Sequence, residues 1–192
     1  MKSIILMFGP AGCGKFTIAK EICKIDPSLK LIHNHHINNV IFELVNPDGK
    51  TKLPPYVWKN IDRVREAVLD TIRETDRNEG YIFTNVMVNN RKYDLSVYEE
   101  IREIATNKGM AFCPIRISIS LEELCVRIAS EGRREMMKDI TPENAIRFMQ
   151  ESEILVPVSD DYLDLDVRNI PPEQSAALIM DWVSSNEPQS GP

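Results

Sequence analysis

Long apolar runs are missing from this sequence of 192 residues. The apolar stretch at residues 4–8 is far shorter than the ~20 residues that a membrane-spanning helix needs. It is also too short for the core of a signal peptide, and no small-residue cleavage site follows it. We therefore expect a cytoplasmic protein that has no membrane partner.

Paired cysteines and an excess of positive charge are missing as well. None of the four cysteines lies in a C-x-x-C pair, so we expect reduced thiols. The formal net charge is −6, which disfavours a nucleic acid as the main partner. Any anion that binds must meet a local cluster of glycine and arginine, so such clusters carry the functional information.

Short apolar runs alternate with segments of helical spacing along the chain. The pattern predicts strands at 2–8, 29–32, 80–86, 111–119 and 162–167. It predicts helices at 16–25, 37–45, 56–78, 95–107, 120–130, from 142 onward, and 172–184, with Ser120 and Glu123 forming a capping box. This alternation favours an α/β fold with three α/β/α layers and a five-stranded parallel sheet. We expect one domain over residues 1–185, mobile insertions near 46–65 and 131–141, and a disordered tail at 186–192.

The strongest motif is a glycine-rich loop between the first predicted strand and the first predicted helix. Glycines let successive backbone N–H groups turn toward one anion, and the following helix adds the positive end of its dipole. A lysine in the loop supplies a point charge for the β- and γ-phosphates of a nucleotide. A chance glycine turn is the alternative, but spacing and context favour a phosphate-binding loop. The predicted nucleotide-binding residues here are Gly9, Ala11, Gly12, Cys13, Gly14, Lys15, Phe16 and Thr17.

The residue after the lysine departs from the usual phosphate-binding loop. Most such loops place Ser or Thr there to ligate Mg²⁺, whereas this chain has Phe16 and brings the hydroxyl one place later, at Thr17. The pattern resembles the nucleoside monophosphate kinases, in which a glycine separates lysine and threonine. The resemblance implies the P-loop NTPase fold, ATP as donor, and Mg²⁺ that Thr17 contacts through water. Cys13, inside the loop, is either a small filler residue or a redox-sensitive thiol.

A second signal follows the fourth predicted strand, where Arg127 precedes Arg133 and Arg134. The position and spacing resemble the start of the mobile lid in shikimate, gluconate and nucleoside monophosphate kinases. The resemblance implies that Arg127 packs on the adenine and that Arg133 or Arg134 stabilises the transferring phosphoryl group. Arginine suits both roles because its planar cation stacks on rings and grips phosphate. The alternative is a solvated charge run, and we expect the lid at about 127–141.

All three histidines lie in one stretch, His33, His35 and His36, together with Asn34. The stretch ends the second predicted strand, where open α/β sheets form their ligand crevice. Shikimate-kinase-like proteins usually carry aspartates there, and the His-Asn-His run resembles an uncharacterised bacterial branch of that group. We predict His35 as a general base and His33, Asn34 and His36 as acceptor-binding residues. A metal site and plain helix-start chemistry remain the alternatives.

Three further candidates follow from position along the chain. Thr84 and Asn85 end the third predicted strand and would contact the acceptor or a metal-bound water. Arg168 follows the fifth predicted strand, where the resembled kinases pack a loop beside the adenine. Related kinases place an acceptor-binding segment at about 34–65.

These features together predict an ATP-dependent kinase that transfers the γ-phosphoryl group of MgATP to a small-molecule acceptor, as a monomer or homodimer. A nucleoside monophosphate kinase is one alternative, although the Gly-Phe-Pro-Arg run of many such enzymes is absent after the third predicted strand. A regulatory nucleotide-binding protein with little turnover is another. The missing metal-ligating hydroxyl and aspartates favour that reading, and the lid arginines argue against it.

Overall fold

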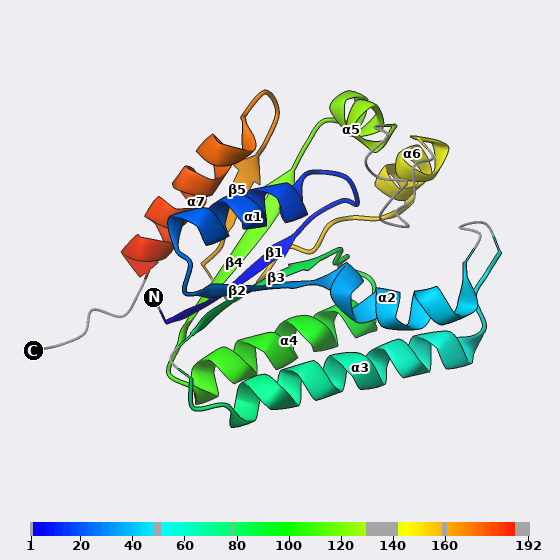
Figure 1. The fold of residues 1–192 in the computed structure, drawn as a ribbon. Coiled ribbons are helices and arrows are strands. Elements are labelled where there is room, and N and C mark those ends of the chain that lie inside the picture. Colours follow the sequence, from blue (N-terminus) through cyan, green and yellow to red (C-terminus); the bar gives the residue numbers. More distant parts are fainter. Residues whose placement is uncertain (1, 48–50, 78, 130–141, 159–160, 187–192) are drawn as a thin grey trace, which may run out of the picture.

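Five parallel strands form the centre of the molecule (Figure 1). The computed structural model describes residues 2–47, 51–77, 79–129, 142–158 and 161–186. The strands run in the order β2-β3-β1-β4-β5 across the sheet, and every neighbouring pair is parallel. Their bounds are β1 Ser3–Phe8, β2 Leu29–His33, β3 Gly80–Asn85, β4 Ala111–Ser118 and β5 Leu163–Asp166. The α/β fold with a five-stranded parallel sheet is thus confirmed.

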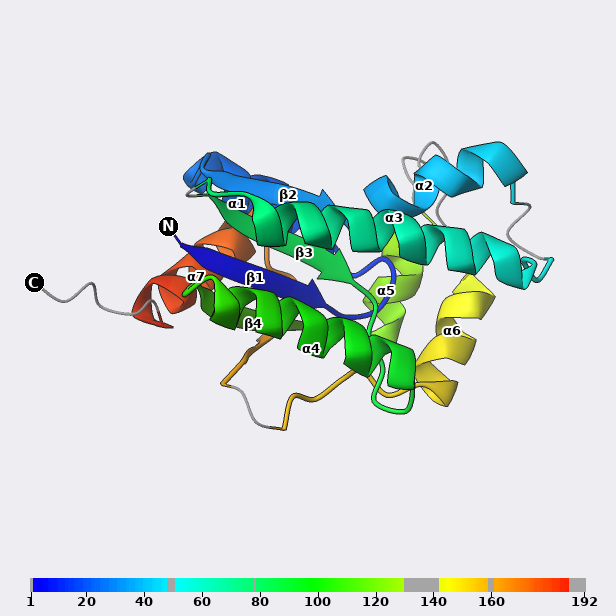
Figure 2. The ribbon, with the colours of Figure 1, turned by 90° about the horizontal axis from the view of Figure 1, so that it is seen from below.

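Helices cover both faces of this sheet (Figures 1 and 2). Helices α1 (Lys15–Ile25) and α7 (Pro172–Asn186) lie on one face, and α3 (Pro55–Glu74) and α4 (Lys92–Asn107) lie on the other. Helices α2 (Asn34–Val45), α5 (Leu121–Ile128) and α6 (Pro142–Glu151) lie beyond the carboxyl ends of the strands. No helix in the described part of the chain is both long enough and apolar enough to span a bilayer.

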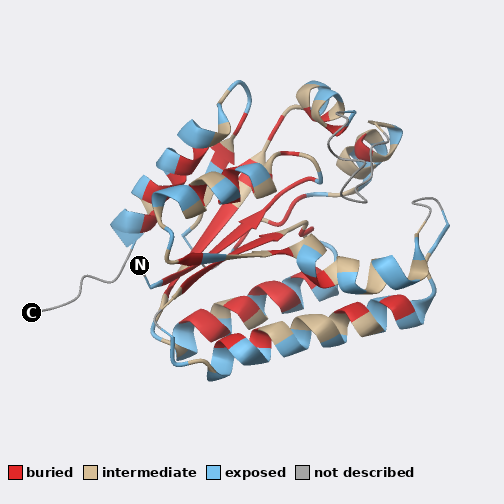
Figure 3. Ribbon diagram, viewed as in Figure 1, coloured by how far each residue is buried: buried red, intermediate tan, exposed pale blue. Residues whose placement is uncertain are grey.

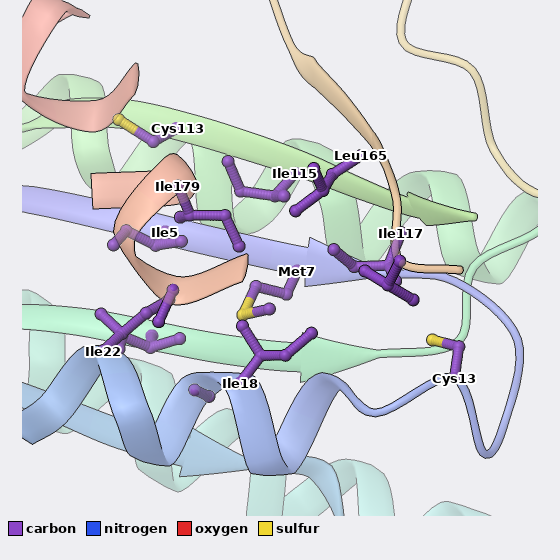
Figure 4. Packing of buried hydrophobic residues seen from close by; sticks show 14 of the residues in the cluster. Ile5, Met7, Cys13, Ile18, Ile22, Cys113, Ile115, Ile117, Leu165 and Ile179 are labelled. Atoms are coloured by element: carbon purple, nitrogen blue, oxygen red, sulfur yellow. The ribbon is translucent and has the colours of Figure 1, made fainter. Parts of the chain in front are cut away.

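The central strand β1 supplies both apolar cores, because successive side chains of a strand point to opposite faces. Ile5 and Met7 pack with α1 and α7, whereas Ile4, Leu6 and Phe8 pack with α3 and α4. Figure 4 shows the first of these cores, and Figure 3 shows that buried residues concentrate in the sheet. All five side chains are fully buried, so neither face of β1 is exposed to water.

Connections leave the sheet in opposite directions around β1. The chain goes from β1 through α1 to β2 at one edge, then from β3 through α4 across β1 to β4. The connections that leave the carboxyl ends of β1 and β3 therefore run to opposite sides of the sheet. Open α/β sheets form a ligand crevice at such a point. The glycine-rich loop leaves β1 at this point.

The segment between β2 and β3 forms the two predicted helices with shifted ends. Residues 55–65, which were also expected within a mobile insertion, form the first half of the helix predicted at 56–78, which is α3 and starts with Pro55 at its first turn. They pack on α2 through a separate apolar cluster that buries Ile37, Val57 and Ile61. Helix α2 starts at Asn34, three residues earlier than predicted, and α3 ends at Glu74, where the Lys108 ammonium donates to the Thr75 carbonyl at 2.8 Å. The insertion expected near 131–141 lies outside the described residues.

Candidate active site

The glycine-rich loop joins β1 to α1 by a turn in which the Cys13 N–H donates to the Pro10 carbonyl at 3.3 Å. A Cβ atom at Gly9 would lie 2.4 Å from the Ile117 carbonyl oxygen of β4, so only glycine fits there. Gly14 has φ of 102°, and a Cβ there would lie 3.3 Å from a guanidinium nitrogen of Arg127. The loop is therefore packed closely between β4 and α5.

The Lys15 side chain folds back over this loop. Its Nζ donates to the carbonyls of Gly9 at 2.9 Å and Pro10 at 2.7 Å, and it lies 3.6 Å from Cys13 Sγ. Lys15 is only 9% exposed, yet it lines the cavity over the loop. The ammonium thus sits at the N-terminus of α1, where an anion would also meet the helix dipole.

Phe16 connects the loop to the end of β2. Its ring stacks on His33 with centroids 4.4 Å apart and an interplanar angle of 22°. His33 is the register partner of Thr84 on β3, and its Nδ1 lies 2.8 Å from the Thr84 hydroxyl. Both residues are buried, so this is a fixed unit that spans α1, β2 and β3. Phe16 also lines the cavity, so its predicted contact with the nucleotide stays a prediction, while its ring packs on His33.

The remaining histidines pack edge-on to His33. The ring centroid of His35 lies 4.9 Å from that of His33, and the centroid of His36 lies 5.7 Å away. His35 and Asn34 line the cavity, and Asn85 lines it from the end of β3. His36 is exposed and is not a lining residue. The tertiary structure thus brings most of the predicted acceptor-binding residues together at one end of the cavity.

Arg127 lies at the other end of the cavity. It donates through Nη1 to the Cys13 carbonyl at 3.0 Å and through Nη2 to the Val167 carbonyl at 3.1 Å. Glu123, four residues earlier on α5, accepts a third hydrogen bond from Nη2. The sequence predicted Glu123 only as part of the capping box with Ser120. Its contact with Arg127 was not predicted, although the i,i+4 spacing of the two residues favours an ion pair.

Arg168 lies next to this end but turns away from it. Its Nε donates to Asp166 at 2.6 Å, and this contact holds the pKa of the Asp166 carboxyl below its ordinary value. Arg168 is exposed and does not line the cavity, whereas its neighbours Val167, Ile170 and Pro172 do. A nucleotide role for Arg168 remains a prediction. Arg133 and Arg134, predicted at the lid, lie outside the described residues.

The cavity that joins these groups has a volume of about 880 Å³, near the upper end of the range for small-molecule sites. The glycine-rich loop follows the central strand β1, whereas the histidines follow β2 and Arg127 contacts Val167 after β5, so these groups line the cavity on opposite sides of the loop. Glu21 is the only carboxylate among the described residues that line it, and Glu21 pairs with Lys24 at 2.7 Å. Three lining residues are cations, namely Lys15, Lys20 and Arg127. The lining therefore carries more positive than negative charge, which suits an anionic ligand.

Lining residues that the sequence did not single out are Ile18, Lys20, Glu21, Val86, Val167, Ile170 and Pro172. Most of these lie within a few residues of a predicted site residue. Gly9 and Cys13, which were predicted, lie beneath the cavity and present their carbonyls to Lys15 and Arg127.

Several solved structures with the same fold are described as kinases. The chain matches a sugar kinase from Janibacter sp. with a TM-score of 0.63 and 15% identity, covering 96% of this chain and 95% of that chain. A gluconokinase from Sinorhizobium meliloti matches with a TM-score of 0.63 and 13% identity, covering 96% and 93%. A thymidylate kinase from Candida albicans matches with a TM-score of 0.55 and 15% identity, covering 96% and 92%.

No family model and no curated protein matches the sequence. The structural matches establish that the chain has the P-loop kinase fold over nearly its whole length. The resemblance drawn from the glycine-rich loop is confirmed at the level of the fold.

Proposed function

We propose that the protein is an ATP-dependent kinase that transfers the γ-phosphoryl group to a small-molecule acceptor. One observation carries this proposal: a single cavity is lined by the glycine-rich loop and Lys15 after the central strand β1, by residues at the ends of β2 and β3 on one side, and by Arg127 and residues after β5 on the other. A phosphoryl transfer needs two ligands that meet at one phosphate-binding loop, whereas a nucleotide sensor needs only one compartment. The kinase names of the structural matches agree with this reading.

The donor would bind with its phosphates on the loop. Lys15 and the backbone N–H groups at the start of α1 would hold the β- and γ-phosphates, since both lie at the positive end of that helix. Catalysis of phosphoryl transfer rests on positioning and positive charge more than on covalent help from the protein. Arg133 or Arg134 would add such charge at the transferring group.

The residues present fit Mg²⁺ only as an ion that arrives with ATP. Among the described residues, no group of three His, Cys, Asp or Glu side chains could hold a metal. Thr17 is exposed and lines the cavity, while the Thr84 hydroxyl is engaged by His33. Thr17 would therefore contact a water of the ion. The bound ion would neutralise phosphate charge, and the ATP phosphates would supply its main ligands.

The histidine end of the cavity would hold the acceptor. His35 lines this end, so its imidazole would take the proton of the attacking hydroxyl or orient it. The acceptor would lie against Phe16, His33 and Thr84. The stacking of Phe16 on His33 and the hydrogen bond between His33 and Thr84 hold these side chains in place. Asn34 and Asn85 would donate or accept hydrogen bonds to acceptor hydroxyls.

The central test is ATP binding by Lys15→Ala. Loss of a charge-assisted contact to phosphate should weaken ATP binding roughly 10- to 100-fold. Lys24→Ala is the matched control on the same helix, because Lys24 is 69% exposed and pairs with Glu21 at the surface. Unchanged ATP affinity in Lys15→Ala would contradict the proposed function.

The acceptor class is tested by incubating the protein with MgATP and a panel of sugars, sugar acids and nucleoside monophosphates. Mass spectrometry would identify any phosphorylated product. Phosphorylation of monophosphates alone would favour a nucleoside monophosphate kinase, a reading that the match to a thymidylate kinase supports. ATP binding without any product across the panel would favour a regulatory nucleotide-binding protein.

A further inference from the structure

The chain that follows β3 forms a short antiparallel contact with the chain that follows α6. The Asn89 N–H donates to the Glu153 carbonyl at 3.0 Å, and the Leu155 N–H donates to the Met87 carbonyl at 3.0 Å. We call residues 152–156 the strap. Because the strap continues directly from α6, this contact attaches the end of that helix to the end of β3.

The strap is held by apolar burial and by one side chain from the opposite segment. Ile154 and Leu155 are buried in the core that lies on the α3 and α4 side of the sheet. The Val156 N–H donates to Asn89 Oδ1 at 2.9 Å. Asn89 therefore binds the strap through its backbone N–H and through its side chain, which makes it the main polar link between the two segments.

The segment that receives the strap also borders the cavity. Asn85 and Val86 line the cavity and come immediately before the residues that pair with the strap. The Val88 N–H donates to Asp94 Oδ2 at 3.0 Å, so this turn is held from below by α4. A change in the position of the strap would therefore act on a turn that is fixed on its other side and ends at the acceptor residues.

The other end of the connection is the glycine-rich loop. Arg127 on α5 donates to the Cys13 carbonyl of that loop at 3.0 Å. Helix α5 packs on α6, since Leu124, Ile128 and Ala145 belong to one apolar core, and Figure 1 shows the two helices side by side. Contacts thus run without a break from the loop through α5, α6 and the strap to the turn after β3.

We propose that the strap couples nucleotide binding at the glycine-rich loop to the turn after β3, and that Asn89 is the positioning residue of this connection. The inference rests on the proposed kinase function, because it requires a nucleotide on the loop. A bound nucleotide would favour one position of Arg127 and hence of α5 and α6, and the strap would carry this preference to Asn85 and Val86. Since coupling between two sites is reciprocal, an acceptor at this turn would strengthen nucleotide binding by the same factor.

The test is amide hydrogen exchange, followed by NMR on the full chain with and without Mg²⁺ and the non-hydrolysable ATP analogue AMP-PNP. The analogue should slow exchange of the Asn89 and Leu155 amides about fivefold or more, which corresponds to the lower end of typical coupling between sites. Binding of the analogue without this change would overturn the inference and leave the kinase proposal standing. Failure of the analogue to bind would contradict the kinase proposal and the inference with it.

Two substitutions of Asn89 separate coupling from binding. Asn89→Ala removes the acceptor of the Val156 N–H but keeps the backbone pairing, so the analogue should slow the Leu155 amide less than about twofold. Asn89 does not line the cavity, so the variant should bind the analogue within about threefold of the wild type. Asn89→Asp keeps an acceptor oxygen and should restore the slowing. Full slowing in Asn89→Ala would overturn the assignment of Asn89.

Asn186→Ala is the matched control. Asn186 contacts the Trp182 carbonyl near the end of α7, at the other end of the molecule from α6 (Figure 1). The analogue should therefore slow the Leu155 amide in this variant as much as in the wild type. An equal loss of slowing in Asn186→Ala and Asn89→Ala would overturn the inference. Matching circular dichroism spectra and unfolding midpoints would establish that the variants are folded.

Discussion

Asp94 is a buried carboxylate that supports the turn after β3. It is 5% exposed, accepts a hydrogen bond from the Val88 N–H at 3.0 Å, and lies 3.5 Å from Arg91. Burial raises the pKa of this carboxyl, and the Val88 and Arg91 contacts oppose the rise only in part. Because the folded pKa is raised, the contribution of Asp94 to stability is greatest below its ordinary pKa and is lost as the pH rises through the folded pKa.

We predict that two substitutions of Asp94 change the free energy of unfolding by different amounts. Asp94→Ala should lower the free energy of unfolding by about 1–3 kcal/mol, because it leaves the buried Val88 N–H without an acceptor. Asp94→Asn keeps an acceptor and removes the buried charge, so its change should stay under about 1 kcal/mol. Urea unfolding at pH 7 measures both. Equal losses in the two variants would show that the charge, rather than the acceptor, is what the turn requires.

At the scale of elements, a three-residue cluster joins α3 to α4. Tyr93 donates its hydroxyl to Asp62 Oδ1 at 2.6 Å, and Arg65 pairs with Asp62 at 3.0 Å. Arg65 also places its guanidinium carbon 4.8 Å from the centre of the Tyr93 ring. Burial and the hydrogen bond to Asp62 raise the pKa of Tyr93 to about 12. The folded cluster therefore favours the neutral phenol.

Tyr93→Phe should lower the free energy of unfolding by about 1 kcal/mol at pH 8, since Tyr93 is 43% exposed and the lost bond is partly solvated. A raised folded pKa means that this contribution is fully present below the ordinary tyrosine pKa of about 10 and disappears as the pH rises toward 12. The measurement is the difference in unfolding free energy between wild type and variant from pH 8 to pH 11. A difference that is constant or grows over this range would contradict the assignment.

At the scale of the whole molecule, β1 couples the two faces of the sheet. Its alternating side chains belong to both apolar cores, so loss of either core disrupts the strand that carries the glycine-rich loop. Leu6→Ala should lower the free energy of unfolding by about 2–5 kcal/mol, because Leu6 is fully buried. Leu44→Ala on α2 is the control: Leu44 is 78% exposed, and its loss should cost less than about 0.5 kcal/mol.

The same variant tests whether the molecule unfolds as one unit. Trp182 packs against the core on the α7 side, whereas Leu6 belongs to the core on the α3 and α4 side. In a Trp58→Phe background, which leaves Trp182 as the single fluorescent tryptophan, its fluorescence and far-ultraviolet circular dichroism should therefore show the same lowered midpoint in Leu6→Ala. Two separate midpoints would show that the faces of the sheet unfold independently.

The sequence was most informative about features that are formed by residues adjacent along the chain. The glycine-rich loop could be recognised because its function depends on residues that are adjacent along the chain. Most helix starts were predicted within one residue, but α2 begins three residues early, at Asn34, because it follows β2 directly and no turn residue marks that boundary. The helix predicted at 56–78 is present as α3, whose first half packs on α2, and the mobility expected near 46–65 stays a prediction.

The sequence by itself determined the parallel α/β fold and the phosphate-binding loop, because hydrophobic periodicity and glycine spacing are properties of neighbouring residues. Only the tertiary structure decided that the Phe16 ring packs on His33, that Arg168 turns to Asp166, and that Glu123 holds Arg127. These outcomes depend on which strand ends meet and on which acceptors lie within hydrogen-bond distance. Such distances arise only when segments far apart in the chain pack together.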